Sequence, residues 1–175
     1  MSRLVRALFA GIIVVGLLAG CGSGSSASAL GDTKAPAQLL RNEVASRVPQ
    51  EIIESLADSE DVSEGCGKDG IMRAWRSTQL MFIVPDKAGR LLTVLDGMVA
   101  SLSEQGWGAE SSQPSSKIHE VRLTSTKIDS VIRVRAVEAS DDEGNGATIE
   151  LSVNGPCVET EGPDSDEVKR LEGRD

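Results

Sequence analysis

The sequence predicts an α+β fold: a two-layer sandwich in which an antiparallel sheet of about four strands carries two helices on one face and is closed by one disulfide. Residues 88–102 have the apolar spacing of an amphipathic helix, and segments nearer the C-terminus alternate apolar and polar side chains as strands do. Two cysteines, Cys66 and Cys157, bracket most of this region. The 175 residues are enough for one ordinary domain.

Residues 1–20 are predicted to be an export signal rather than part of the fold. Arg3 and Arg6 precede an uncharged apolar run that is shorter than the roughly 20 apolar residues of a transmembrane helix. The run ends in Leu18-Ala19-Gly20-Cys21, which resembles the lipobox of bacterial lipoproteins. This resemblance implies cleavage before Cys21 and a lipid on its thiol. The alternative is an ordinary secretory signal that happens to contain a cysteine.

A Gly/Ser-rich stretch follows the cysteine, and residues 21–35 are predicted to be a flexible tether. Lipobox and tether together resemble small lipoproteins of high-GC Gram-positive bacteria. The resemblance implies a lipid anchor on Cys21, palmitate included, that holds the protein on the extracytoplasmic face of the cell membrane. Because the net charge of the chain is −9, we expect the lipid to act without help from a basic membrane-binding patch.

The folded domain is expected over residues 36–157 and begins with a helix. Apolar side chains recur at four-residue spacing over residues 37–57, and Pro49 is expected either to kink this helix or to divide it in two. Residues 58–70 are polar, acidic and contain several glycines, which predicts a loop. Residues 71–84 include a dense apolar block, which predicts a central strand covered on both faces.

The second half of the domain is expected to be a helix followed by three strands. For the 88–102 helix, Asp86 is the predicted N-cap and Gly106 the residue that ends it. A Ser-rich loop comes next, and the strands are expected at residues 117–124, 128–139 and 147–154. From residue 158 the chain is acidic and lacks periodicity, so residues 158–175 are predicted to be a disordered tail.

With Cys21 assigned to the lipid, Cys66 and Cys157 are predicted to form a disulfide. An exported protein meets conditions that permit such a bond, and two remaining cysteines allow one pairing. The alternative is a redox pair or a reactive thiol, but the two cysteines do not have C-x-x-C spacing. The glycines beside Cys66 also match G-x-G-x-x-G. We interpret them as a loop shaped around the disulfide, because no helix is expected after them.

The composition argues against several classes of function. A net charge of −9 opposes binding to nucleic acid, which needs a concentrated basic surface. Aromatic residues make up 2% of the chain, which leaves few rings for stacking sugars or bases. The single histidine, His119, excludes metalloprotease motifs and is predicted to be a surface or edge-strand residue. We therefore expect no catalytic residue, no metal site and no cofactor.

The arginines are the residues that suggest binding. Arg133 and Arg135 share one strand face by alternation, and Arg122 lies in the preceding strand. If these faces coincide with those of Arg73 and Arg76, the sheet has a basic patch that suits a carboxylate, a phosphate or an acidic partner. The alternative is that each arginine pairs with a neighbouring glutamate across the sheet, which contributes little to stability.

These features predict a lipid-anchored protein of the cell envelope with a binding or accessory role and without enzymatic activity. Its expected partners are the membrane, through the lipid on Cys21, and an envelope protein or a small anionic ligand. The alternative is a surface-anchored hydrolase that uses carboxylates, with or without calcium. Two acidic runs would supply the carboxylates: Asp58, Glu60, Asp61 and Glu64, and then Asp141, Asp142, Glu143 and Asn145. Neither run has the spacing of a twelve-residue calcium loop, and solvated charge is the simpler interpretation.

Overall fold

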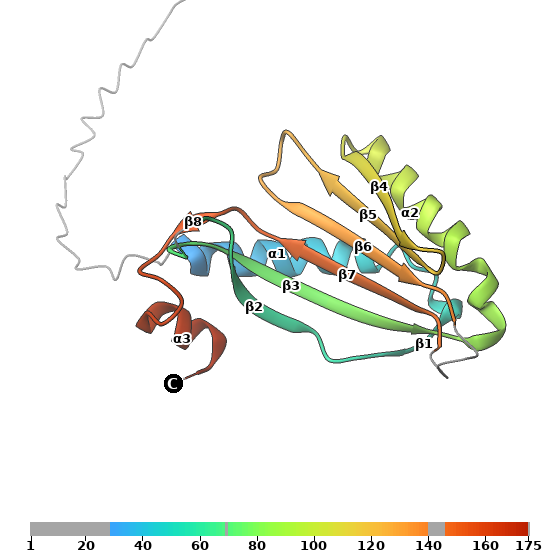
Figure 1. Ribbon diagram of the computed structural model, residues 1–175, viewed down its shortest axis with the longest axis horizontal. Coiled ribbons are helices and arrows are strands. Elements are labelled where there is room, and N and C mark those ends of the chain that lie inside the picture. The colour runs from blue at the N-terminus through green and yellow to red at the C-terminus, as the bar shows by residue number, and fades with distance from the viewer. Residues whose placement is uncertain (1–28, 69, 140–145, 175) are drawn as a thin grey trace, which may run out of the picture.

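β3 (Met72–Ile83) is the longest strand and the centre of an antiparallel sheet. In this computed structural model, which describes residues 29–68, 70–139 and 146–174, the strand order is β1-β3-β7-β6-β5-β4, and β2 and β8 also pair with β3 (Figure 1). The other strands are β1 (Ile53–Leu56), β2 (Glu60–Gly65), β4 (Gly108–Ser115), β5 (Ile118–Thr124), β6 (Val131–Val137), β7 (Thr148–Asn154) and β8 (Val158–Glu159). The helices are α1 (Ala29–Ala45), α2 (Leu91–Glu104) and α3 (Asp166–Glu172), with two 3-10 helices, η1 (Gln50–Ile52) and η2 (Pro85–Arg90).

The predicted fold class is wrong. We expected about four strands and two helices, whereas the described residues form eight strands and three helices. Two polar segments account for much of the difference. β2 and β4 have few apolar side chains, yet their backbones pair with β3 and β5 along most of their length. Backbone hydrogen bonding thus makes strands of segments whose side chains predict loops.

α1 lies earlier in the chain than predicted. It starts at Ala29, inside the stretch predicted to be a tether, and ends at Ala45, so the helix expected over residues 37–57 is confirmed for residues 37–45 and wrong for the rest. Pro49 does not kink an α-helix, because it directly precedes η1 and the chain then enters β1. Only residues 21–28 of the predicted tether remain, and they lie outside the described residues. The helix packs along β3 and β7 (Figure 1).

α2 forms where the apolar spacing predicts a helix, but with a different start. Its buried side chains belong to the same core as those of the sheet. Asp86 is not its N-cap, because Asp86 lies in η2 and the helix begins at Leu91. Gly106 follows the end of the helix as predicted, and its φ of 93° is a left-handed conformation that glycine adopts without strain. None of the described helices is both long and apolar enough to cross a bilayer.

Alternation along the strands gives the sheet two different faces. In β6, Ile132, Val134 and Ala136 are fully buried, and the residues between them point the other way. The buried side chains of α1, α2 and these strands form one core. The two helices therefore cover one face of the sheet and leave the opposite face open to solvent.

The C-terminal residues are folded, so the predicted disordered tail is wrong for residues 158–174. β8 pairs with the start of β3, and α3 packs against β2. The backbone N–H and the hydroxyl of Ser63 both donate to Glu172 Oε1, at 2.8 and 2.7 Å. Val168 of α3 is fully buried. The folded domain therefore extends beyond the predicted residues 36–157 at both ends.

The predicted disulfide is confirmed. Cys66 and Cys157 are bonded, with their Cα atoms 6.0 Å apart and a sequence separation of 91. The bond joins the segment that follows β2 to the segment between β7 and β8. Both cysteines are exposed, so the bond is a covalent link at the surface and adds little packing to the core.

Replacing both cysteines with serine should lower the free energy of unfolding by about 4–5 kcal/mol, because the unfolded chain regains the freedom of a loop of roughly 90 residues. Both sites are exposed, so replacing each sulfur with the smaller oxygen of serine leaves no cavity in the core. Urea denaturation of the Cys66→Ser, Cys157→Ser variant and of oxidised wild type measures the difference. Reduced wild type is the control and should match the variant. Equal midpoints for oxidised and reduced wild type would contradict the prediction.

Candidate functional site

Three arginines from two neighbouring strands lie on the face of the sheet that the helices leave uncovered. Arg122 on β5 and Arg133 on β6 are directly opposite each other, and Arg135 lies opposite a glutamate on each side. We call this surface the open face, and its residues include Glu64, Arg76, Glu120, Arg122, Arg133, Arg135, Glu150, Ser152 and Asn154.

Arg73 does not belong to the open face. It is 9% exposed and lies on the opposite side of the sheet, where its Nε and Nη2 donate to the hydroxyl and carbonyl oxygens of Ser63 at 2.9 and 2.8 Å. Arg76, by contrast, is on the open face. Residues an odd number of positions apart in a strand point to opposite faces. Arg73 and Arg76 are three positions apart in β3, so they cannot share a patch. This spacing is visible in the sequence.

The open face contains both paired and unpaired arginines. Arg76 is 3.7 Å from Glu60 Oε2 and 3.4 Å from Glu64 Oε1, and Arg135 is 3.9 Å from Glu150 Oε2. Arg122 and Arg133 make no hydrogen bond or ion pair with any described residue. Arg122 has Glu110 opposite it on β4, but the two side chains form no ion pair. Arg122 and Arg133 are therefore two like charges at directly opposite positions, and neither has an ion-pair partner among the described residues.

A shallow hollow of about 130 Å³ lies beside Arg133 on the open face. It is lined by Glu64, Arg76, Glu120, Arg133, Arg135, Glu150, Ser152 and Asn154. Ser152 is the cross-strand neighbour of Arg133, and the amide of Asn154 donates to Glu64 Oε2 at 3.2 Å. The hollow thus offers a guanidinium and a hydroxyl side by side, which are donors that suit an oxyanion.

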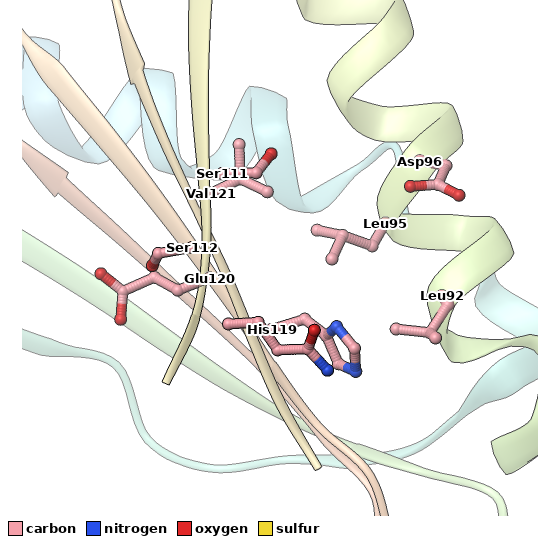
Figure 2. A pocket seen from close by; sticks show the side chains of 9 residues that line it. Leu92, Leu95, Asp96, Ser111, Ser112, His119, Glu120 and Val121 are labelled. Atoms are coloured by element: carbon pink, nitrogen blue, oxygen red, sulfur yellow. The ribbon is translucent and has the colours of Figure 1, made fainter. Parts of the chain in front are cut away.

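A larger pocket of about 310 Å³ lies between α2 and the hairpin of β4 and β5 (Figure 2). Figure 2 shows Leu92, Leu95 and Asp96 on the helix side and Ser111, His119 and Val121 on the strand side. Sequence reasoning did not identify this pocket, because β4 was expected to be a loop. His119 is the one lining residue that sequence analysis considered for a functional role, and none of the lining residues belongs to a recognised motif.

His119 was predicted to be a surface or edge-strand residue, and it does not lie on an edge strand. β4 pairs along the outer side of β5, and the side chain of His119 is only 20% exposed. Its Nε2 lies 2.8 Å from Glu138 Oε1, so a carboxylate holds the imidazole in one orientation. The ring is consequently a fixed part of the pocket wall.

The first acidic run does not form a cation site. Glu60, Asp61 and Glu64 lie in β2, so their side chains alternate: Glu60 and Glu64 approach Arg76, whereas Asp61 points to the other face and accepts from Gln38 Nε2 at 2.9 Å. In the part of the chain that the structure describes, no three His, Cys, Asp or Glu residues gather closely enough to hold a metal ion. The second run, residues 141–145, lies outside the described residues.

Two carboxyl groups have shifted pKa values, and both shifts are downward. Burial raises the pKa of Asp61, but the neighbouring polar groups of Ser77 and Trp75, the hydrogen bond from Gln38 and the charge of Arg41 outweigh it, so the pKa lies below the ordinary 3.8. Burial likewise raises the pKa of Glu172, and donors from Ser63 and Arg174 bring it below 4.5. A general acid needs a raised pKa, so neither group suits the role of general acid in a carboxylate hydrolase.

The free energy of unfolding should fall as the pH is lowered below about 4.5, because both carboxylates have lower pKa values in the folded state than in the unfolded state. Their contribution is complete above the unfolded pKa values and is lost as the pH falls through the folded ones. Asp61→Asn should lower stability at pH 7 by about 1–2 kcal/mol and flatten this decline. Asp58→Asn, at an exposed site, is the control. Urea denaturation from pH 3 to pH 7 tests this, and an unchanged profile for Asp61→Asn contradicts it.

Comparison with known proteins assigns no family to this chain. It matches no protein-family model, no curated protein and no solved structure. The features that bear on function are therefore the signals in the sequence and the geometry of the open face and the pocket.

Proposed function

We propose that the protein is a lipid-anchored component of the cell envelope that binds a small anionic group on the open face of its sheet. The anchoring part of the proposal rests on Leu18-Ala19-Gly20-Cys21 and the apolar run before it. These residues lie outside the described part of the chain. Since α1 begins at Ala29, residues 22–28 alone separate the lipid-bearing cysteine from the folded domain.

The opposition of Arg122 and Arg133 is the observation that supports the binding part. Side chains directly opposite each other on antiparallel strands have Cβ atoms about 4.5–5.5 Å apart, and like charges in this position destabilise a sheet. No described acidic side chain forms an ion pair with either guanidinium. A carboxylate or phosphate lying between them would relieve the repulsion and accept several N–H bonds at once. Ser152, beside Arg133, adds a hydroxyl donor.

The surrounding charges restrict what this site accepts. Glu120 and Glu150 flank Arg135, and Glu60 and Glu64 flank Arg76. An extended polyanion would meet these carboxylates as well as the arginines, and like-charge contacts oppose such a partner. The arrangement therefore favours a single compact anionic group, free or displayed by an envelope component.

Cys21→Ala should leave an unlipidated precursor that retains its signal, because the thiol is the attachment point for the diacylglyceryl group. Metabolic labelling with an alkyne fatty acid, followed by intact-mass measurement, detects the change. Cys66→Ser is a matched control because it removes a different thiol and should still be labelled. Normal labelling of Cys21→Ala would rule out the proposed anchor.

Arg133→Gln should weaken the binding of inorganic phosphate and of succinate about tenfold or more, because a hydrogen bond to a charged group contributes roughly 1.5–3 kcal/mol. Titrations followed by amide chemical shifts measure the affinity and show whether residues around Arg122, Arg133 and Ser152 respond. Arg90→Gln is the control, since Arg90 lies in η2 and pairs with Glu51.

Stability separates this proposal from a purely structural role of the arginine. Relief of the repulsion with Arg122 should leave the free energy of unfolding of Arg133→Gln equal to that of wild type or higher. Equal anion affinities for Arg133→Gln and Arg90→Gln would overturn the binding proposal, as would a clear loss of stability on Arg133→Gln alone.

A further inference from the structure

The pocket between α2 and the β4–β5 hairpin, which we call the helix–hairpin pocket, contains polar side chains without partners (Figure 2). Asp96, Ser111 and Gln113 line it and form no side-chain hydrogen bond or ion pair with any described residue. Leu92, which is 38% exposed, contributes apolar surface at the same place. The pocket thus combines unused acceptors with an accessible apolar wall. This combination is typical of sites for small ligands, although the volume is near the lower limit for such sites.

His119 presents a ring nitrogen to this pocket. Its Nε2 lies 2.8 Å from Glu138 Oε1, and a contact this short with a carboxylate oxygen makes Nε2 the protonated nitrogen. In the tautomer that donates from Nε2 to this carboxylate, Nδ1 has a lone pair that can accept a hydrogen bond. Nδ1 has no hydrogen-bond partner among the described residues. Figure 2 shows the ring on the side of β5 that faces α2.

The charge of the lining is negative. Asp96 is the carboxylate on the helix side of the pocket, and no lysine or arginine is among the lining residues. Glu120 also lines the pocket, but its side chain points away from it toward the open face (Figure 2). An anionic ligand would therefore meet repulsion here, whereas a cation would find the carboxylate of Asp96 unpaired. The helix–hairpin pocket thus has an unpaired carboxylate, whereas the open face has two unpaired arginines, Arg122 and Arg133.

We propose that the helix–hairpin pocket binds an organic cation, namely an ammonium or guanidinium group on a short apolar stem. Asp96 pairs with the charge, and His119 Nδ1 and the oxygen of Ser111 or Gln113 accept further N–H bonds. The stem packs on Leu92. Glu138 is a positioning residue that acts through His119. The cation is either a free amine or the side chain of a lysine or arginine displayed by a partner, and both have the same chemistry.

Titration of the mature chain with n-butylamine, followed by amide chemical shifts, tests the proposal. Shifts are expected at residues of α2 and β5 that line the pocket. Two probes of the same stem length separate charge from apolar contact: 1-butanol lacks the charge, and butyrate has the opposite one. Both should bind at least tenfold more weakly than n-butylamine. Equal binding of 1-butanol and n-butylamine would overturn the proposal.

Asp96→Asn should weaken n-butylamine binding at least tenfold. Asp129→Asn, in the exposed turn between β5 and β6, removes the same charge elsewhere and should leave binding unchanged. His119→Gln and Glu138→Gln should each weaken binding severalfold, and retained amide dispersion shows that the variants are folded. Wild-type affinity in Asp96→Asn would refute the site. Arg133→Gln should bind n-butylamine as wild type does, so this test is independent of anion binding on the open face.

A second titration identifies the source of the cation. A blocked peptide with one lysine between alanines presents the same ammonium on a partner-like backbone. Tighter binding of the peptide than of n-butylamine supports a side chain displayed by a partner protein. Tighter binding of the free amine supports a small molecule.

Discussion

The pairing of β3 with four other strands is the constraint on which this structure depends. β1 and β2 pair along one edge, and β7 and β8 pair along the other. The helix-covered side of β3 buries Trp75, Met81 and Ile83. Because strands from both ends of the described chain meet on this one strand, neither half can complete the core without the other. The disulfide, the docking of α3 and the orientation of the open face all follow from this arrangement.

The parts of the fold with apolar periodicity were predictable, and the polar parts were not. α2, β6 and β7 bury regular sets of side chains, and their spacing is visible in the sequence. β2 and β4 form through backbone bonds to their neighbours, and every residue of β4 is exposed. In the C-terminal segment the signals were present but short: the hydroxyl of Ser165 accepts from the N–H of Val168 at the start of α3, and Gly173 has a left-handed φ of 66° at its end.

The candidate sites divide in the same way. Period-two alternation was enough to place Arg133 and Arg135 on one face, but the facing of Arg122 and Arg133 depends on the register of β5 and β6, which side-chain patterns do not specify. Predicting the helix–hairpin pocket would have required two facts that the sequence does not show. One is that β4 is a strand, and the other is that α2 leaves the side chains of β4 exposed. Unpaired polar groups such as Asp96 become visible only when their neighbours are known.

The start of α1 and the end of α3 lie close together, which determines what surrounds a tag attached at the C-terminus. Lys34 near the start of α1 donates to the carbonyl of Leu171 in α3 at 3.0 Å, and Figure 1 shows both elements at the same end of the sheet. If Cys21 carries a lipid, a tag or fluorophore fused to the C-terminus would sit beside the membrane surface. Such a fusion would report bilayer proximity well, whereas a bulky one would compete with the headgroups for the same space.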